Sequence, residues 1–454
     1  MIKNYQDYSN KDISLDDKYK KFCNNTDAVF KKYPQLKPLR LIIFKKIITT
    51  KLYVDNISII KRKIRHLLIK GSTNTRGKKA DIIIFIEGTR EVIVDNLLPL
   101  YHELIKSRKS VLIITFGCDV EEKNIKFIAP IKNYDISWLE DAYHELIRCA
   151  SIKNDLRIFN TIKEELYHAH SISLELESVF KKIQPKLVLY ATNNMIAGSC
   201  IPFICKKLNI HDVLIQHGML NQFHLPIESK LLISWGKFSD TRLNKMGISN
   251  EKYISLGSPR WDTIKLSKND QDRKEILNMY NLLDRPILIF FSNGNDLYRN
   301  GIAPEEAVKW LEKAKSTYSN KFNILIKLHP NEDGGLYKNT DLVVMNDELG
   351  YNVIMNGCDI VCSICSSSMS EAVIYKKPVW QFYADNWPHL AEHYNHGLAL
   401  RISSQYDLMN SIDDFLSNPE KYSPTLNISD VYKNQGEAAK QICRYLSKNF
   451  ISQS

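Results

Sequence analysis

The sequence predicts two doubly wound α/β domains in tandem, preceded by a basic helical region. Its 454 residues suffice for two or three domains of ordinary size. Short apolar runs alternate with helical stretches, and the alternation restarts after a charged stretch at 263–284. Short, continuous apolar runs are typical of parallel strands that helices cover on both faces. The 44% hydrophobic and 25% charged residues exclude a mainly disordered or collagen-like chain.

Hydrophobic periodicity places the elements of each domain. In the first domain we predict strands at 82–86, 111–116, 187–190, 213–215 and 231–235, with helices at 93–106, 138–150, 160–182 and 196–207. In the second we predict strands at 287–291, 324–328, 342–345, 360–363, 379–382 and 398–402, with helices at 304–318, 351–356, 368–376, 405–416 and 434–449. The expected organisation is a basic helical region over 1–70, a first domain over 71–265, a second over 266–430, and a C-terminal helix within 431–454 that can cross back onto the first domain.

The net charge of +11 is concentrated at the N-terminus. Residues 1–70 hold 17 Lys and Arg but 6 Asp and Glu, and the rest of the chain is balanced. The apolar residues over 57–68 recur at a helical period, with the basic residues outside that stripe. Two interpretations stay open: an ordinary helix with a solvated basic face, or a helix lying on anionic lipid. Because the sequence shows neither an apolar run of about 18 residues nor a signal-peptide core, we expect a cytoplasmic chain whose partners include an anionic membrane surface and exclude nucleic acid.

Cysteine and histidine spacing does not favour a metal site. Nine cysteines without a secretion signal indicate reduced thiols. Cys358, Cys362 and Cys365 lie in a buried strand pattern without a fourth ligand at zinc spacing, so they are interpreted as apolar fillers. The histidines at 389, 393 and 396 are interpreted as a polar loop. We therefore predict no metal and no bound cofactor.

Two strand ends in the second domain predict contacts to an anion. The strand in ILIKLHPNEDGG (324–335) ends in Lys327, His329 and Pro330. A cation and an imidazole at a sheet edge suit a phosphate group. In FSNGND (291–296), Asn293 and Gly294 occupy the first strand-to-helix turn and could contact a diphosphate. The alternative is a polar strand terminus without a ligand.

A serine run supplies the next candidates. Ser366, Ser367 and Ser368 follow a buried strand and open a helix, where hydroxyls and helix-start amides suit an anion. Glu371 lies three residues after Ser368. It can form a capping box with Ser368, or it can accept hydrogen bonds from ribose hydroxyls.

In the first domain, a histidine follows a strand. VLIQHGML (213–220) ends its strand in Gln216, His217 and Gly218. A histidine at a strand end is a candidate general base, and a glycine lets the backbone approach a ligand. Glu87, at the end of the first clear strand, is the second candidate base or an acceptor ligand.

The segment GSPRWD (257–262) forms a further candidate turn. Arg260 and Asp262 in it can pair with each other. A structured turn that closes the first domain is favoured over direct chemistry, and Arg260 is kept as an acceptor-side candidate.

The ordered set of these motifs resembles a known group of enzymes. QHG at 216–218, GSPRWD at 257–262, KLHP at 327–330, and SSSMSEA followed by KKPV at 366–379 are similar to GT-B glycosyltransferases and polymer transferases of bacterial surface polysaccharide assembly. The resemblance covers roughly residues 180–400. Transferases that use CMP donors, such as those of Kdo and sialic-acid-like sugars, and CDP-glycerol or CDP-ribitol phosphotransferases of teichoic-acid type both share parts of this set. The CDP-polyol group has an Asp before the serines and Phe-Asp after them, where this chain has Cys-Ser-Ser-Ser and Ser-Glu-Ala.

The resemblance implies a GT-B fold and a metal-independent transfer from a nucleotide-activated sugar. The main expectation is transfer of Kdo or another nonulosonic acid from a CMP donor to a growing surface polysaccharide, such as lipopolysaccharide O-antigen or capsule, or to a lipid-linked acceptor. The second domain would bind the nucleotide, with Lys327, His329 and the serines on the departing phosphate. His217 or Glu87 would take the acceptor proton, with Gln216, Gly218 and Arg260 on the acceptor side. The alternatives are a CDP-polyol phosphotransferase, an enzyme like UDP-sugar 2-epimerase, and a non-enzymatic glycan- or nucleotide-binding scaffold.

Overall fold

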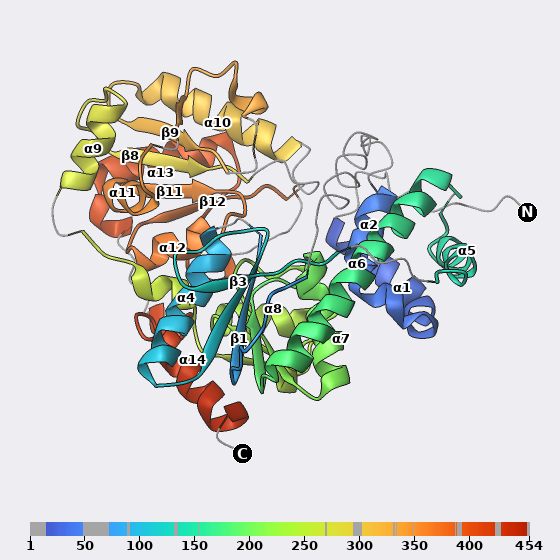
Figure 1. The fold of residues 1–454 in the computed structure, drawn as a ribbon. Coiled ribbons are helices and arrows are strands. Elements are labelled where there is room, and N and C mark those ends of the chain that lie inside the picture. Colours follow the sequence, from blue (N-terminus) through green and yellow to red (C-terminus); the bar gives the residue numbers. More distant parts are fainter. Residues whose placement is uncertain are drawn as a thin grey trace, which may run out of the picture. The chain divides into compact units, whose positions relative to one another are not determined.

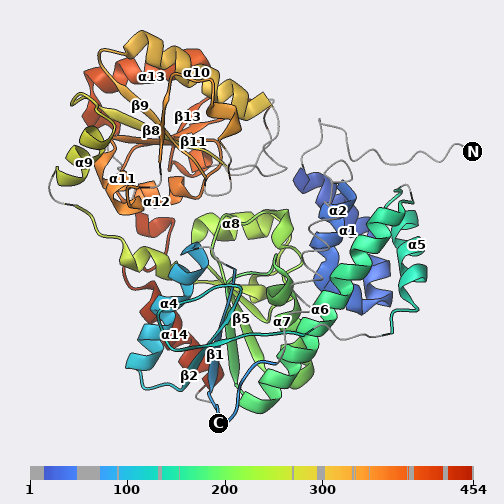
Figure 2. The ribbon, with the colours of Figure 1, turned by 45° about the horizontal axis from the view of Figure 1, so that its top comes forward.

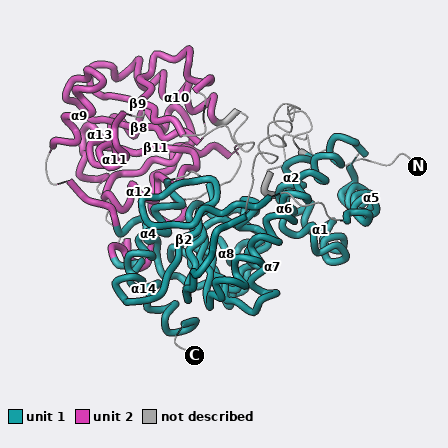
Figure 3. The backbone as a smooth tube through the Cα atoms, viewed as in Figure 1, with its two compact units in different colours: residues 1–262, 437–454 teal, residues 263–436 magenta. Residues whose placement is uncertain are grey.

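The computed structural model divides the chain into two compact units, which Figure 3 colours separately. Unit 1 comprises residues 1–262 and 437–454, and unit 2 comprises residues 263–436. The structure describes residues 15–48, 72–88, 91–130, 135–152, 154–267, 270–293, 302–329, 332, 334–346, 348–385, 387, 393–422 and 428–451. The helix predicted over 57–68 lies outside these residues.

Unit 1 is built on a parallel seven-stranded sheet with the strand order β3-β2-β1-β4-β5-β6-β7. Its strands are β1 Ile82–Glu87, β2 Val111–Phe116, β3 Asn124–Lys126, β4 Leu187–Tyr190, β5 His211–Ile215, β6 Leu231–Ser234 and β7 Tyr253–Ser255. The two edge strands, β3 and β7, were not predicted from the sequence. Each has three residues, none of them buried, so neither produces the apolar run by which the other strands were recognised.

Helices cover both faces of this sheet, as Figures 1 and 2 show. On one face lie α4 (Glu91–Lys106) and α14 (Ala438–Leu446), and on the other lie α6 (Leu156–Ile183) and α7 (Ile196–Leu208). The alternate residues Ile82, Ile84 and Ile86 of β1 join α4 and α14 in one buried cluster, because side chains of a strand alternate between its faces. Unit 1 also contains α5 (Leu139–Cys149) and α8 (Lys237–Lys245).

The basic N-terminal region is packed into unit 1. It forms α1 (Leu15–Lys32), a 3₁₀ segment (Pro34–Leu39) and α2 (Arg40–Ile48). Tyr19, Phe22 and Phe44 are buried, and the rings of Tyr19 and Phe44 lie 5.2 and 6.0 Å from that of Phe223. The Tyr19 hydroxyl donates a hydrogen bond to the carbonyl of Leu225 at 2.8 Å. Helices α1 and α2 are therefore part of the unit 1 core and contact the loop that follows β5.

Unit 2 is built on a parallel six-stranded sheet with the order β10-β9-β8-β11-β12-β13. Its strands are β8 Ile287–Phe291, β9 Asn323–Lys327, β10 Val343–Met345, β11 Ile360–Ser363, β12 Val379–Phe382 and β13 Leu400–Ile402. Its helices are α9 Gln271–Met279, α10 Ile302–Tyr318, α11 Tyr351–Gly357, α12 Ser368–Ile374 and α13 Gln405–Ser417. Helices α10 and α13 lie together on one face of the sheet, and α9 and α11 lie on the other (Figure 2).

Both sheets share one topology, in which the first strand of the unit has the second strand on one side and the fourth on the other. The connections therefore diverge between β1 and β4 in unit 1, and between β8 and β11 in unit 2. In open α/β sheets, ligands bind outside the carboxyl ends of the strands at such a switch point. The residues that follow these strands are the first place to look for a site.

Among the described residues, no helix combines the length and the apolar character that crossing a membrane requires.

Candidate functional site

The carboxyl ends of β8 and β9 in unit 2 are tied together by Ser292. The backbone N–H of His329 donates to Ser292 Oγ at 2.8 Å, and the N–H of Ser292 donates to the Lys327 carbonyl at 3.0 Å. Ser292, which is buried, in turn donates its hydroxyl proton to Glu332. These bonds fix the backbone of the turn after β9, so that Lys327 and His329 are held at the sheet edge, each half-buried.

At the neighbouring switch point, Asn293 connects β8 to the segment after β11. Its Oδ1 accepts hydrogen bonds from Ser363 Oγ and from the backbone N–H of Cys365, both at 3.2 Å. Ser363 Oγ also accepts from the N–H of Ser366 at 3.2 Å. Since Asn293 is 5% exposed and Ser363 fully buried, this network is a rigid base beneath the serine run.

The serine run continues this network outward. Ser366 Oγ donates to Ser368 Oγ at 3.1 Å and accepts from the N–H of Ser368 at 3.2 Å, and Ser366, Ser367 and Ser368 are half-buried. The predicted capping box of Ser368 with Glu371 is wrong. Helix α12 begins at Ser368 itself, its preceding residue Ser367 forms no side-chain cap, and the Ser368 hydroxyl is engaged by Ser366.

Glu371 is a buried residue in the first turn of α12. It is 4% exposed. Burial raises the pKa of the Tyr432 phenol well above its usual value, and the negative charge of Glu371 adds to that rise. Ser370 on the same turn hydrogen-bonds His393 Nε2 at 2.9 Å, and His393 is fully buried. His393 therefore supports α12 through Ser370, and the burial of Glu371 corrects the prediction that it is a ribose acceptor at the open edge.

The structure places six of the predicted site residues at the ends of three adjacent strands, β9, β8 and β11: Lys327, His329, Asn293, Ser366, Ser367 and Ser368. Pro330 and Gly294 lie outside the described residues. Sequence analysis missed Ser363 and Glu332, which connect the strand ends. A signal for Ser363 existed, since it is the polar residue that closes the apolar run of β11. The edge offers an ammonium, an imidazole and hydroxyls, which is a donor set suited to phosphate oxygens.

In unit 1, Glu87 occupies the switch point and is turned inward. It is 3% exposed, and its two carboxylate oxygens accept from the backbone N–H groups of Ala197 at 2.9 Å and Gly198 at 2.7 Å, at the start of α7. Burial raises the pKa of Glu87 to about 7, although hydrogen bonds from these amides and from Thr192 favour the carboxylate. Because a base must reach its substrate, the prediction of Glu87 as a base at the open edge is corrected: it anchors α7.

Position 198 at the start of α7 requires glycine, because a Cβ there would lie 1.7 Å from the carbonyl oxygen of Thr192. Gly218 is different. A Cβ on Gly218 would have no atom within 4 Å, and its backbone lies outside the left-handed region. Neither packing nor conformation therefore explains the glycine at 218, and the space in front of it is open to a ligand.

Gln216 and His217 follow β5 and have separate roles. Gln216 is buried, accepts from the backbone N–H of Trp235 at 3.1 Å and donates to the Gly218 carbonyl at 3.0 Å. It therefore braces the ends of β5 and β6 instead of presenting its amide to an acceptor, as had been predicted. His217 is half-buried, with its ring 6.3 Å from that of His224. Of the predicted bases in unit 1, His217 is the one that the structure leaves at the sheet edge.

Arg260 and Asp262, which their spacing predicted as a pair, each contact a helix of unit 1. Arg260 Nε lies 3.6 Å from Asp95 on α4. Asp262 accepts from the backbone N–H groups of Ala438 at 2.9 Å and Ala439 at 2.7 Å, and so caps the N-terminus of α14. Both side chains thus hold helices of unit 1 in place.

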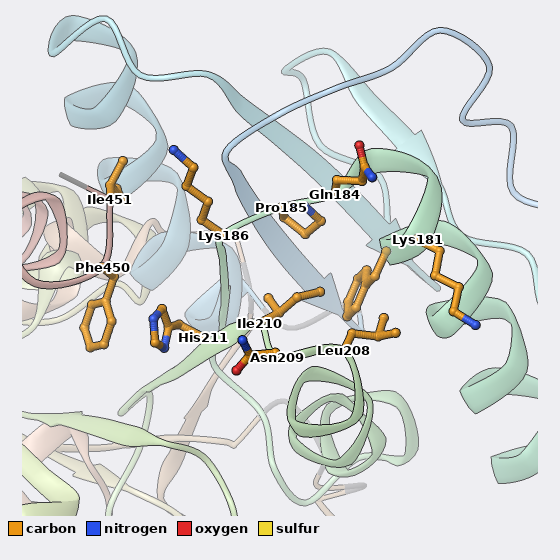
Figure 4. Close-up of a pocket in the computed structure, with 11 residues that line it drawn as sticks. Lys181, Gln184, Pro185, Lys186, Leu208, Asn209, Ile210, His211, Phe450 and Ile451 are labelled. Atoms are coloured by element: carbon orange, nitrogen blue, oxygen red, sulfur yellow. The ribbon is translucent and has the colours of Figure 1, made fainter. Parts of the chain in front are cut away.

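A cavity of about 550 Å³ opens at the opposite, amino-terminal edge of the unit 1 sheet (Figure 4). It lies where α6 and α7 end and β4 and β5 begin, and Figure 4 shows His211 beside Phe450, with ring centroids 5.0 Å apart. The carboxyl ends of helices carry partial negative charge, which disfavours an anionic ligand and favours a basic residue such as Lys181 in the last turn of α6. None of the predicted site residues lines this cavity.

The described residues contain no group of three or more His, Cys, Asp or Glu side chains arranged to hold a metal ion. Cys358, Cys362 and Cys365 are buried; Cys362 lies in β11, Cys358 follows α11, and the Cys365 thiol contacts Asn293 Oδ1 at 3.4 Å.

Comparison with known proteins shows what this arrangement is similar to. Residues 228–445 match the model of the family "CDP-Glycerol:Poly(glycerophosphate) glycerophosphotransferase". The chain is a transferase. The match covers just under half of its length and includes all of unit 2. A search of curated protein sequences found no match.

Solved structures share the fold at low sequence identity. UDP-GlcNAc 2-epimerase from Neisseria meningitidis is 17% identical with a TM-score of 0.55, and the enzyme from Methanocaldococcus jannaschii is 17% identical with a TM-score of 0.52; in both cases 81% of this chain and 100% of the other is covered. A glycosyltransferase from Rickettsia africae is 12% identical with a TM-score of 0.50, covering 83% of this chain and 100% of that one. The chain has the GT-B fold of two α/β domains predicted from its motifs.

Proposed function

We propose that this protein transfers a polyol phosphate from a CDP-activated donor to a hydroxyl group of a surface-polymer acceptor. The observation that carries the proposal is the family match over 228–445, because it spans the unit 2 edge where Lys327, His329 and the serines follow three adjacent strands. The match supports the CDP-polyol alternative rather than the main expectation, transfer of Kdo from a CMP donor.

In the proposed reaction, an acceptor hydroxyl oxygen attacks the polyol-bearing phosphorus of the donor. The bond from that phosphorus to the bridging oxygen breaks, CMP leaves, and a phosphodiester forms. His217 takes the hydroxyl proton as general base. Lys327, His329 and the serine hydroxyls stabilise the charge that develops on the departing CMP phosphate. Because these side chains supply the positive charge and the donors, the proposal requires no metal ion, and a chelator is expected to leave the rate unchanged.

The test is a His329→Ala variant assayed for CMP release from CDP-glycerol in the presence of acceptor. The contact of His329 with Ser292 uses its backbone N–H, so alanine removes the imidazole while retaining the turn. We expect turnover to fall by about a hundredfold or more, the usual loss when one charge-stabilising group is removed. His102→Ala, which removes an exposed imidazole on α4 paired with Glu122, is the matched control.

A donor panel decides between the alternatives. CMP release from CDP-glycerol or CDP-ribitol would support the proposal. Turnover of CMP-Kdo alone would contradict it and favour the transfer of Kdo that the sequence analysis expected. Interconversion of UDP-GlcNAc without acceptor would indicate an epimerase. Nucleotide binding without any turnover would indicate a scaffold. Unchanged turnover of His329→Ala would remove this side chain from the mechanism.

We also propose that residues 1–70 bring the protein to the inner face of the plasma membrane by binding anionic lipid. Lys20 and Lys21 on α1 are exposed, whereas Tyr19 and Phe22 belong to the unit 1 core, so deleting the region would damage the fold. A Lys20→Gln/Lys21→Gln variant is therefore the better test. At about 1 kcal/mol for each basic residue near the lipid surface, binding to phosphatidylglycerol vesicles should fall roughly thirtyfold. Equal sedimentation of this variant, the wild type and a Lys106→Gln/Lys109→Gln control would contradict the proposal.

A further inference from the structure

A further cavity of unit 1, of about 680 Å³, opens beside the loop that precedes β1. Residues 72–79 of this loop line it together with Lys182, which lies in the last turn of α6. Because the loop leads into β1 and α6 leads into the parallel strand β4, the cavity lies at the amino-terminal edge of the sheet. His217 follows the carboxyl end of β5, at the opposite edge. The cavity is therefore separate from the candidate site residues of unit 1.

Buried threonines anchor this loop to the body of unit 1. Thr73 and Thr75 are both buried, and the backbone N–H of Thr73 donates to Glu175 Oε1 at 2.8 Å. The backbone N–H of Lys78 donates to the carbonyl of Thr75 at 3.0 Å and closes a turn, in which the glycine at 77 has a left-handed φ of 67°. The fold thus sets the shape of the loop, and the side chain of Arg76 within the turn stays exposed.

Four basic side chains line the cavity, and no acidic side chain does: Arg76, Lys78, Lys79 and Lys182. Lys79 Nζ donates to Gln184 Oε1 at 2.5 Å, which is a neutral partner. Within the part of the chain that the structure describes, none of the four forms an ion pair with a carboxylate. Glu175, which anchors the loop, is buried and lies outside the cavity lining. The lining of the cavity therefore carries a net positive charge.

Other lysines at the same edge of the sheet have acidic partners. Lys181 and Lys207 each lie 2.7 Å from a carboxylate oxygen of Glu177, and Lys186 lies 3.4 Å from Asp81. The negative end of the α6 dipole accounts for a lysine in its last turn, but it does not account for three basic residues in a loop before a strand. A concave surface lined by charge of one sign concentrates the electrostatic potential and attracts ions of the opposite sign.

We propose that Arg76, Lys78, Lys79 and Lys182 form a binding site for a phosphate group, separate from the site of the transfer reaction. The guanidinium of Arg76 binds two phosphate oxygens, and the three ammonium groups neutralise the charge of the phosphate. This inference does not depend on the proposed function. Two sources can supply such a group, a soluble phosphate compound or the headgroup of an anionic lipid, and the experiment distinguishes them.

The test measures the reductive methylation of individual lysines in the full-length protein by mass spectrometry. The probes are inorganic diphosphate, phosphatidylglycerol vesicles, and phosphatidylcholine vesicles as the control without net charge. We expect protection of Lys78 and Lys79 but not of Lys206, which is exposed on α7 and lies outside the cavity lining. Protection by diphosphate alone would assign a soluble ligand, whereas protection by phosphatidylglycerol vesicles would assign a lipid headgroup. Absence of protection by either probe would overturn the proposal.

The decisive variant is Arg76→Gln/Lys182→Gln, which removes two charges and leaves Lys78 as the reporter. The printed hydrogen bond of Arg76 uses its backbone N–H, so glutamine retains it. The concentration of the protecting probe that halves methylation of Lys78 should rise about tenfold, as for the loss of two exposed charge pairs. Lys206→Gln/Lys207→Gln removes the same charge at the same edge and should leave that concentration unchanged. Equal shifts in both variants would show a general effect of charge and overturn the site. Loss of CDP-polyol turnover with protection intact would overturn the proposed function alone.

Discussion

The switch points of the two sheets have the same topology but opposite electrostatic character. In unit 1 the crevice between β1 and β4 holds a carboxylate, Glu87, whose two oxygens are bound by backbone amides of α7. In unit 2 the crevice between β8 and β11 holds an amide and hydroxyls, with Asn293 joined to Ser363 and the serine run beyond it. The unit 1 crevice contains a carboxylate bound by helix amides. In the unit 2 crevice Asn293 and the serines are neutral, and the adjacent strand end carries Lys327, His329 and the carboxylate of Glu332, which is bound by Ser292.

This difference shows how one fold serves two purposes. The N-terminus of a helix favours negative charge, whether the charge comes from the protein or from a ligand. Unit 1 supplies that charge itself, with Glu87 at α7 and Asp262 at α14, which makes these contacts structural. In unit 2 the N-terminus of α12 follows neutral serines, and no carboxylate of the described residues caps it, so this helix start is suited to a phosphate from outside.

The largest effect is expected from a carboxylate placed at the start of α12 in unit 2, where it would resemble Glu87 at the start of α7 in unit 1. Ser366→Asp places a carboxylate within the serine run, where it would repel a phosphate with about 4 kcal/mol at 4 Å and an effective dielectric constant near 20. We expect CDP binding, measured by calorimetry, to weaken more than a hundredfold. Ser366→Asn is the neutral control of the same size and should weaken binding much less. Similar affinities for the two variants would mean that no phosphate binds near Ser366.

A smaller effect is expected from removing the charge in unit 1. The pKa of Glu87 is raised from 4.5 to about 7, so folding favours the protonated acid relative to the unfolded chain, and Glu87 is predominantly the anion of unit 1 only above about pH 7. The resulting stabilisation is complete below pH 4.5 and is lost as the pH rises through 7, a change of about 3 kcal/mol. Glu87→Gln has no such dependence. Relative to this variant, the wild type should therefore become less stable between pH 5 and pH 8.

Hydrogen exchange of the segment 187–208, corrected for intrinsic rates, measures this difference in unit 1 alone. The quantity compared at each pH is the free energy of opening of the wild type minus that of Glu87→Gln. Titrating groups common to both proteins cancel in the difference. A difference that does not change with pH would show that Glu87 keeps one protonation state throughout, and the account of its burial would be wrong.

The sequence predicted the sheet interiors well because buried parallel strands are marked by apolar runs. Strands such as β1 and β8 are wholly buried, and their predicted bounds agree with the structure to within one residue. The edge strands β3 and β7 lack that pattern, since they have three residues each and only partial burial. The packing of α1 and α2 against Phe223 depends on ring contacts between residues that are 204 and 179 positions apart, which no local pattern contains.

For the site, the sequence identified residues at strand ends but not the directions of their side chains. Glu87 and His217 both follow strands of the same sheet, and either could have been the base. The structure separates them because Glu87 meets the amides of α7 and is 3% exposed, whereas His217 is half-buried. Which neighbour a polar side chain meets depends on the tertiary arrangement. The motif order could therefore predict the edge but not the inward rotation of Glu87, Gln216 and Asp262.

The smallest predicted effect concerns the second internal anion of unit 1. Asp262 is the last residue before the chain enters unit 2, and it caps α14, which begins where the chain has returned. Asp262→Ala leaves the amides of Ala438 and Ala439 without this acceptor and should destabilise α14 by about 1–2 kcal/mol, the usual cost of losing a cap and its charge. Faster hydrogen exchange of 438–446 would report it.

Glu437→Ala provides the matched control for this variant. Glu437 is an exposed acidic residue directly before α14, and its side chain does not cap the helix. Its removal should change the exchange of 438–446 by less than about 0.5 kcal/mol, as for an ordinary surface substitution. If both variants accelerated exchange equally, general negative charge near α14 would account for the effect. If only Asp262→Ala accelerated exchange, the stabilisation of α14 would come from the direct hydrogen bonds of Asp262 to its first amides, as the bonds of Glu87 do at α7.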